Sequence, residues 1–225
     1  MTLATGRVAV EDRARRTAGR SDDAILDAVG RVLEQRRPRP GIALDVGCGT
    51  GRLAARLAPR WPRYIGVDVV RHAGLDPACE FHAVDLDTEP LPLPDDAVDL
   101  TLSIETIEHL ENPRRFVREL ARVTRPGGCV IVTTPNQLSV LSLLCLLTRG
   151  RFVAFQDVDY PAHVTALLES DLCRIAGECG LTDARVDYSR AGRVPLTRRR
   201  YPAALSARFP RRCSDNVVLS ALKPA

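Results

Sequence analysis

The sequence predicts an α/β fold in which a mostly parallel sheet is covered by helices on both faces. Short strand-like runs alternate with helical patterns along most of the chain, an arrangement typical of parallel sheets. A glycine-rich turn follows directly after the first of these strands. The 225 residues, of which 45% are hydrophobic, are enough for one full core. We therefore expect a single domain over residues 1–225.

The first half of the chain begins with a helix and continues mainly as strands. Ser21-Asp22-Asp23 is typical of a helix start, because its side-chain oxygens satisfy the free backbone N–H groups of a first turn. Apolar residues then recur at helical spacing until Pro38, so residues 1–38 are expected to form an N-terminal helical extension. The elements that follow are strands over residues 42–46, 64–69, 80–84 and 99–104 and a helix over residues 52–58.

The second half of the chain completes the alternation but carries two insertions. Residues 137–168 do not fit simple strand–helix alternation, and residues 190–212 are rich in Arg and Pro. A proline in the first turn favours a helix over residues 113–123. The other expected elements are a turn over residues 125–128, strands over residues 129–134, 181–188 and 216–222, and a helix over residues 171–179.

The composition limits the kinds of function that the protein can have and the cell compartment in which it is expected. The formal net charge of +4 is too small by itself to indicate a nucleic-acid surface. The seven cysteines include no CxxC pair, so we expect reduced thiols rather than a zinc site or a redox motif. The N-terminus lacks an apolar segment of signal-peptide length, and the run from Leu138 to Leu147 is too short to span a bilayer. We therefore expect a cytoplasmic protein without a transmembrane segment.

The turn after the first strand is the strongest functional signal. Gly47, Gly49 and Gly51 alternate there, and missing side chains let a backbone approach a ligand closely. Arg52 stands where the dinucleotide pattern GxGxxG needs its last glycine. Asp45, at the end of the strand, would repel a pyrophosphate but suits a cationic ligand without phosphate, such as S-adenosylmethionine. The alternative is a tight turn with a satisfied aspartate.

Two further aspartates end the next strands. Asp68 is placed to accept both ribose hydroxyls of an adenosine, although strand-end aspartates also cap helices. Asp85 follows the third strand and is placed to receive the adenine amino group, unless it caps its own loop. Together with Asp45 and the glycines, these positions predict an adenosine pocket at the carboxyl ends of the strands.

Six segments together match the pattern of one family: LDVGCGTG, IGVD, VDLDTEPLPLPDDAVDLTLS, IETIEHLENP, RVTRPGGCVIVTTPN and DNVVLSALKP. In them the sequence resembles the class I S-adenosylmethionine-dependent methyltransferases of the type 11 group, over roughly residues 40–188 and again at the last strand. The resemblance implies a Rossmann-like sheet of seven strands with the last strand antiparallel. It also implies S-adenosylmethionine as cofactor and S-adenosylhomocysteine as product.

The resemblance also assigns roles within the cofactor site. It places the glycine turn around the methionine part of the cofactor, with Ser103 near the methionine end, Asp68 on the ribose and Asp85 with Leu86 at the adenine. The complete set of expected cofactor residues is Asp45, Gly47, Cys48, Gly49, Gly51, Asp68, Val69, Asp85, Leu86 and Ser103.

Residues 105–109 (ETIEH), just past the fourth strand, are the candidates for the transfer chemistry. If they form a helical turn, Glu105, Glu108 and His109 lie on one side of it. The motif resembles the ExxEH of ubiquinone-type O-methyltransferases and of small-RNA terminal 2′-O-methyltransferases, which implies divalent-metal ligands. Many relatives carry an EHL stretch without a metal. His163 falls where such relatives often have a histidine, as a base, a fourth ligand or a simple loop residue. The candidate catalytic residues are Glu105, His109 and His163, and the candidate metal ligands are Glu105, Glu108, His109 and His163.

The expected function is methyl transfer from S-adenosylmethionine to a hydroxyl oxygen of a small molecule, in secondary-metabolite, glycan, lipid or quinone metabolism. Residues 137–168 are expected to cap the acceptor, and their apolar run fits a buried helix best, with an acceptor pocket or a membrane contact as alternatives. Two other functions stay open. One is an RNA 2′-O-methyltransferase, which weak basicity and scarce aromatic residues disfavour; the other is a cofactor-binding protein without catalysis. His72 and His82 lack such a context and are expected at the surface.

Overall fold

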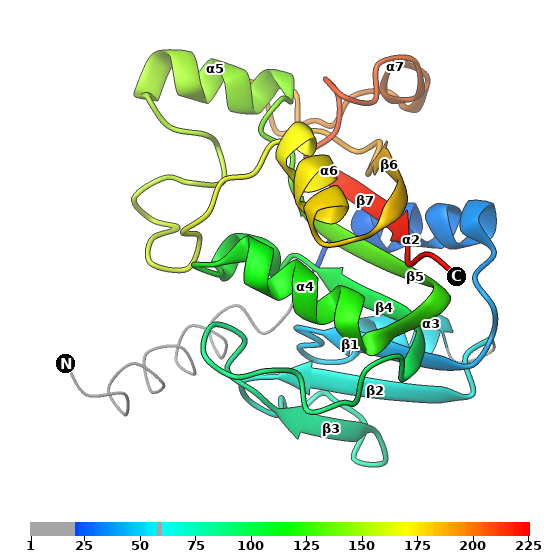
Figure 1. Ribbon diagram of the computed structural model, residues 1–225. Coiled ribbons are helices and arrows are strands. Elements are labelled where there is room, and N and C mark those ends of the chain that lie inside the picture. The colour runs from blue at the N-terminus through cyan, green and yellow to red at the C-terminus, as the bar shows by residue number, and fades with distance from the viewer. Residues whose placement is uncertain (1–20, 58–59) are drawn as a thin grey trace.

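The computed structural model describes residues 21–57 and 60–225. In it a central sheet lies between two layers of helices (Figure 1). The sheet has seven strands in the order β3-β2-β1-β4-β5-β7-β6. In chain order the strands are β1 (Ile42–Val46), β2 (Arg63–Asp68), β3 (Glu80–Ala83), β4 (Val98–Ile104), β5 (Thr124–Pro135), β6 (Thr182–Tyr188) and β7 (Asn216–Leu222).

The direction of the strands confirms the expected mixed sheet. β1 pairs in parallel with β2 on one side and with β4 on the other. β7 runs antiparallel to both of its neighbours, β5 and β6, and is the last strand of the chain. The turn predicted over residues 125–128 is wrong in one respect: these residues lie within β5. Thr124 already pairs with Val98. The register between β4 and β5 then shifts before Leu100 pairs with Cys129, and the glycines between Thr124 and Cys129 lie in this irregular part of the strand.

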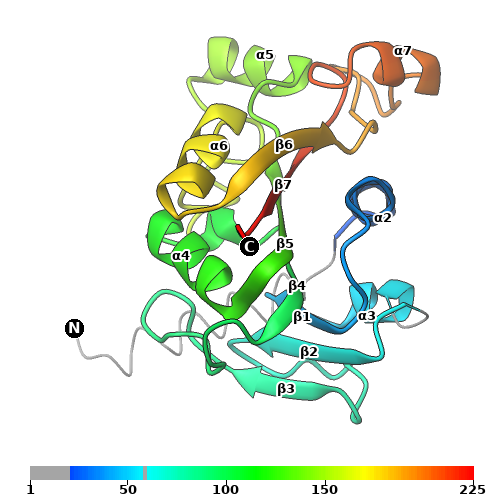
Figure 2. The same ribbon diagram turned by 45° about the vertical axis from the view of Figure 1, so that its right-hand side comes forward.

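Helices cover both faces of the sheet. Leu44 and Val46 pack in one core with residues of α4 and α6, whereas Ala43 packs in a second core with residues of α2 and α3. This alternation along β1 follows from the two-residue period of a strand. Figure 2 shows the two layers of helices on either side of the sheet. The helices are α2 (Asp23–Arg36), α3 (Arg52–Leu57), the 3₁₀-helix η1 (Ile107–His109), α4 (Pro113–Val123), α5 (Val140–Arg149), α6 (Glu169–Glu178) and α7 (Ala203–Arg208).

The helix starts are set by side-chain caps that the sequence makes visible. Asp22 Oδ1 accepts the backbone N–H of Ala24 at the start of α2. Asn112 Oδ1 accepts the N–H of Arg115 at the start of α4, and Pro113 occupies the first turn. Both predicted helix starts are therefore confirmed. Residues 1–20 of the expected N-terminal extension lie outside the described residues.

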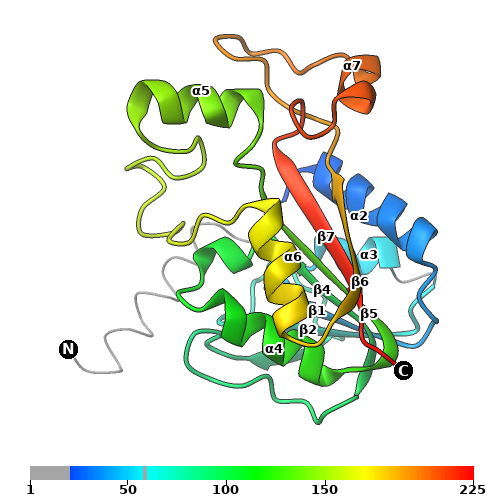
Figure 3. The same ribbon diagram turned by 45° about the horizontal axis from the view of Figure 1, so that its top comes forward.

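The two insertions lie at the same end of the molecule. Residues 137–168 contain α5, residues 190–212 contain α7, and both helices project beyond the sheet where β5 ends (Figures 1 and 3). The expectation of a buried helix over Leu138–Leu147 is wrong, because Ser142 is the one buried residue of α5. Among the described residues, no helix combines the length and apolar character needed to cross a membrane.

Candidate functional site

The glycine turn follows β1 and crosses the end of β2. The N–H groups of Gly47 and Cys48 both donate to the carbonyl of Val67, at 2.8 and 3.1 Å. Gly47 has a φ of 80°, and a Cβ built there would lie 2.1 Å from Thr106 Oγ1. Only glycine fits this position, since a side chain would meet both backbone strain and Thr106. The turn therefore presses directly against the segment that leaves β4.

Asp68, the last residue of β2, holds the same turn from the other side. Its Oδ2 accepts the N–H of Gly49 at 2.9 Å, and its Oδ1 accepts the N–H of Val69 at 2.7 Å. Burial raises the pKa of Asp68, while these backbone donors act in the opposite direction. The carboxylate has four lone pairs and so keeps acceptor capacity beyond these backbone bonds, and its assignment to the ribose hydroxyls stays a prediction.

His72 lies beside this carboxylate rather than at the surface. Its side chain is only 8% exposed, and its Nε2 lies 4.0 Å from Asp68 Oδ2. The predicted surface position of His72 is therefore wrong: the loop after β2 folds back over the strand end. The side chain of His82 is half-buried next to Glu80.

Asp45 and Ser103 supply two buried polar atoms that have no hydrogen-bond partner among the described residues, Asp45 Oδ1 and Ser103 Oγ. The other carboxylate oxygen of Asp45 accepts the hydroxyl of Tyr64 at 2.6 Å. Burial raises the pKa of Asp45 to about 7. Buried polar atoms without partners are rare in folded proteins and indicate a position where a ligand or a water molecule binds. Asp45 lies at the end of β1 beside the glycine turn, so its free oxygen fits a cofactor that presents a cationic group. Ser103 lies on the opposite face of the sheet, because Asp45 pairs with Leu102 in the neighbouring strand.

Asp85 and Leu86 lie in the loop after β3. Asp85 is buried and its Oδ1 accepts the N–H of Asp87 at 3.1 Å, so one oxygen caps the loop, as the alternative interpretation expected. Leu86 is half-buried against the core. The assignment of Asp85 and Leu86 to the adenine stays a prediction.

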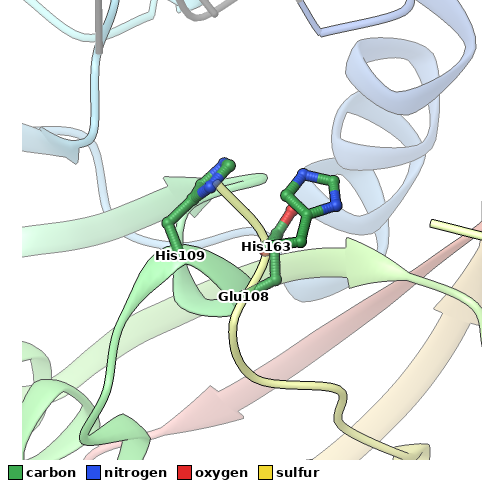
Figure 4. Close-up of side chains that lie close together, drawn as sticks. All are labelled: Glu108, His109 and His163. Carbon is green, nitrogen blue, oxygen red and sulfur yellow. The ribbon is translucent and has the colours of Figure 1, made fainter. Parts of the chain in front are cut away.

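A second cluster lies where the chain leaves β4. Glu108, His109 and His163 each offer one ligand atom, and these atoms lie within 4.8 Å of one another (Figure 4). The first two side chains come from η1, and the third comes from the 137–168 insertion. The carbonyl of Glu108 accepts the N–H groups of Val164 and Thr165, each at 3.0 Å, which fixes the returning insertion against η1.

The hydrogen bonds of the two imidazoles indicate which nitrogen carries the hydrogen. Nδ1 of His109 lies 2.8 Å from the carbonyl of Ala162, and Nδ1 of His163 lies 2.5 Å from the carbonyl of Ala154. A carbonyl accepts only, so each Nδ1 carries the hydrogen, and in the neutral ring Nε2 carries the lone pair. Nε2 is the nitrogen that can take a proton or bind a metal. Outer hydrogen bonds of this kind orient the histidine ligands of metal sites.

Glu105 does not join this cluster. Its φ of 54° takes it out of the turn, and its Oε1 accepts the side-chain amide of Asn216 on β7 at 2.7 Å. The expectation that residues 105–109 form one helical turn with Glu105, Glu108 and His109 on one side is therefore wrong, because η1 contains only residues 107–109. The structure brings together three of the four predicted ligands and directs the fourth elsewhere.

Burial controls the protonation of both glutamates. It raises the pKa of Glu105 to about 7, and it raises the pKa of Glu108 well above the ordinary range, with the neighbouring Glu105 adding to the effect. Glu108 Oε2 accepts the hydroxyl of Thr134 at 3.1 Å. Two close buried carboxyl groups share at least one proton unless a cation lies beside them.

Several residues of the site were not predicted. Tyr64 bonds Asp45, Thr106 packs on the glycine turn, and Thr134 and Asn216 bond the two glutamates. Tyr64 lies within a predicted strand, yet nothing in the sequence marks it as a partner of Asp45. The other three contacts join segments far apart in the chain, so only the folded structure shows them.

Comparisons with known proteins agree with this site. Residues 44–132 match a family model described as a methyltransferase domain. A probable S-adenosylmethionine-dependent methyltransferase of Mycolicibacterium smegmatis is 29% identical over 177 residues, which cover 76% of this chain and 65% of that protein. A probable methyltransferase of the same kind from Mycobacterium tuberculosis is 37% identical over 143 residues, covering 62% of this chain and 48% of that one. The chain thus spans about half to two thirds of the length of these relatives.

Solved structures show the same fold. A putative methyltransferase, in complex with the Haloferax volcanii activator Trm112, superimposes with a TM-score of 0.68 at 18% identity, covering 96% of this chain and 98% of that one. At this identity the likeness concerns the fold alone. Residues 44–132 therefore carry a methyltransferase domain, and the strand order, the glycine turn and these relatives make the chain similar to the S-adenosylmethionine-dependent methyltransferases.

Proposed function

We propose that this protein transfers the methyl group of S-adenosylmethionine to a hydroxyl oxygen of a small-molecule acceptor. The observation that carries the proposal is the adjacency of the glycine turn and the Glu108–His109–His163 cluster. Thr106 lies against Gly47 and directly precedes η1, so one short segment connects the two. An acceptor held at the cluster would therefore lie next to a cofactor held at the turn.

The cofactor would be held by the residues at the ends of the first three strands and of β4. The glycine turn would let the methionine part approach the backbone, and the unpartnered Oδ1 of Asp45 would gain a partner. Asp68 would accept the ribose hydroxyls. When bound, S-adenosylmethionine supplies an electrophilic methyl group with a good neutral leaving group.

The cluster would activate the acceptor oxygen. A hydroxyl is a weak nucleophile until its proton is removed, and Nε2 of His109, which carries the lone pair of the neutral ring, would take that proton. His163 is held close to it, with ring centroids 4.8 Å apart. Residues 137–168 return over η1 and would exclude water from the acceptor. Alignment and desolvation of the two reactants then supply much of the remaining catalysis.

The same three side chains also fit a divalent metal. One carboxylate oxygen and two imidazole nitrogens suit Mn²⁺, Fe²⁺ or Zn²⁺ better than Mg²⁺. A metal there would lower the pKa of the acceptor hydroxyl and balance the charge of Glu108. This version replaces the four-ligand set by Glu108, His109 and His163, since Glu105 bonds Asn216.

We place the reaction in the cytoplasm, in secondary-metabolite, glycan, lipid or quinone metabolism. All seven cysteines are unpaired thiols in the structure, in keeping with a reducing compartment.

Methylation of an acceptor by the purified protein tests the proposal. The protein is incubated with S-adenosylmethionine and a panel of hydroxylated small molecules, matched amines and short RNAs, and S-adenosylhomocysteine and methylated product are measured by mass spectrometry. We expect a methyl ether to form from at least one hydroxylated compound. Turnover only with amines or RNA would contradict the proposal. Binding of S-adenosylmethionine without turnover of any acceptor would favour a cofactor-binding protein.

A further inference from the structure

The helix α5 is apolar but contributes almost nothing to the core. Its sequence, VLSLLCLLTR, contains one buried residue, Ser142. The Oγ of Ser142 donates to Gln137 at 3.4 Å and accepts the N–H of Val153 at 3.3 Å, whereas Leu141 and residues 143–146 are half-buried. Val140 is 39% exposed and Leu147 84% exposed. The helix thus buries a serine and leaves its apolar side chains partly or largely exposed, unlike the usual amphipathic helix.

The neighbouring helix α7 also carries exposed apolar side chains. Leu205 is 40% exposed, and Phe209, just after the helix, is 49% exposed. The segment after α7 is attached to the start of α5, because Val140 N–H donates to the carbonyl of Arg212 at 2.9 Å. Figures 1 and 2 show both helices at one end of the molecule, beyond the sheet. We call the exposed apolar residues of the two helices, Val140, Leu147, Leu205 and Phe209, the α5–α7 face.

Three arginine side chains lie on or directly after these two helices. Arg149 ends α5, Arg208 ends α7 and lies over the ring of Phe209 at 5.1 Å, and Arg212 donates to the carbonyl of Leu138 at 3.0 Å. These three side chains form no ion pair with a carboxylate of residues 21–57 and 60–225, whereas Arg151 and Arg211 nearby pair with Asp157 and Glu169. The face thus combines exposed apolar side chains with unpaired guanidinium groups.

We propose that the α5–α7 face lies on a lipid bilayer that contains anionic headgroups. A ten-residue helix is too short to span the hydrocarbon core, but it can lie in the interface with its exposed apolar side chains among the acyl chains. The guanidinium groups then meet the negative headgroups, which attract basic residues near a membrane. A second copy of this chain would cover the apolar side chains, but its arginines would then face the arginines of the first copy. An anionic bilayer satisfies both features.

This placement has a consequence for the acceptor, and that part rests on the proposed function. The insertion that carries α5 also carries His163 into the catalytic cluster. A protein docked through α5 therefore holds its acceptor side next to the bilayer. The acceptor is then a hydroxylated amphiphile that resides in the membrane, rather than a freely soluble metabolite.

Sedimentation with lipid vesicles tests the docking without cofactor or acceptor. The whole chain is spun with vesicles of phosphatidylcholine alone or of phosphatidylcholine with phosphatidylglycerol. We expect binding to the anionic vesicles, weakened by salt. Leu147→Glu, at a site 84% exposed, should reduce binding about tenfold or more, because burial of a leucine is lost and a repelled charge is added. Ala55→Glu adds the same charge at an exposed position of α3, far from α5 in Figures 1 and 2, and should leave binding unchanged.

Equal vesicle binding of the wild type and Leu147→Glu would overturn the proposal, and so would failure of the wild type to bind anionic vesicles. A wild-type dimer that Leu147→Glu converts to a monomer, with no vesicle binding, would assign the face to a second copy instead. Because the assay contains neither cofactor nor acceptor, its failure leaves methyl transfer untouched. Conversely, a wild-type protein that binds anionic vesicles but methylates no hydroxylated acceptor would count against the proposed function alone.

Discussion

Replacing His109 with alanine is expected to lower the rate of methyl transfer by about 10²–10⁴ while the affinity for S-adenosylmethionine survives. The Nδ1 bond to the carbonyl of Ala162 holds the imidazole beside Glu108 and His163 and leaves the lone pair on Nε2. Alanine removes the base or ligand and leaves the glycine turn intact. Initial rates of S-adenosylhomocysteine formation give the loss, and calorimetry gives the affinity. His82→Ala, on the half-buried histidine of β3, is the matched control and should keep the wild-type rate.

A chelator separates the two versions of the mechanism. If the cluster holds a metal, removal of the metal should abolish turnover, and Mn²⁺ or Zn²⁺ should restore it. If His109 acts as a base alone, the chelator should have no effect. In either version Glu105→Gln should cost less than Glu108→Gln, because Glu105 bonds Asn216 outside the cluster. Full activity of His109→Ala would contradict both versions and leave His109 as a packing residue of η1.

Replacing Asp68 with alanine is expected to weaken S-adenosylmethionine binding about ten- to a hundredfold. The substitution removes charge-assisted acceptors for the ribose hydroxyls, at a cost of about 1.5–3 kcal/mol. It also frees the N–H of Gly49, which Asp68 holds at 2.9 Å, so the glycine turn loses an anchor. Calorimetry with S-adenosylhomocysteine measures the loss without turnover.

Two further variants make this result specific. Asp68→Asn keeps an oxygen for the N–H of Gly49 but loses the charge, so its affinity should fall between those of the wild type and Asp68→Ala. Asp27→Ala removes an exposed carboxylate of α2 that pairs with Arg56, and it should bind like the wild type. Unchanged affinity of Asp68→Ala would show that the ribose lies elsewhere.

The cofactor side of the site was predictable from sequence because its constraints are local. Gly47 needs its positive φ within the turn itself, and the spacing to Gly49 and Gly51 is visible in the chain. Asp45 and Asp68 end strands whose pattern is also local. The α/β alternation follows for the same reason, since each element shows its own periodicity.

The acceptor side was predicted less well because distant segments shape it. Glu105 leaves the turn since Asn216 of β7 bonds it, more than a hundred residues later in the chain. His163 could be named but not placed, because its position depends on the bonds of Val164 and Thr165 to Glu108. The exposure of α5 was also unpredictable: an apolar run indicates burial, and only the fold shows that Ser142 faces inward.

The central claim, that the glycine turn and its aspartates form a site for S-adenosylmethionine, is tested most directly by calorimetric titration of the purified protein with S-adenosylmethionine, S-adenosylhomocysteine and NAD. Asp45, buried at the end of β1 with Oδ1 lacking a hydrogen-bond partner among the described residues, suits a cationic ligand and opposes a pyrophosphate. We therefore expect saturable binding of S-adenosylmethionine and S-adenosylhomocysteine at one site per chain, with NAD bound far more weakly. Equal affinity for NAD and S-adenosylmethionine would contradict the account.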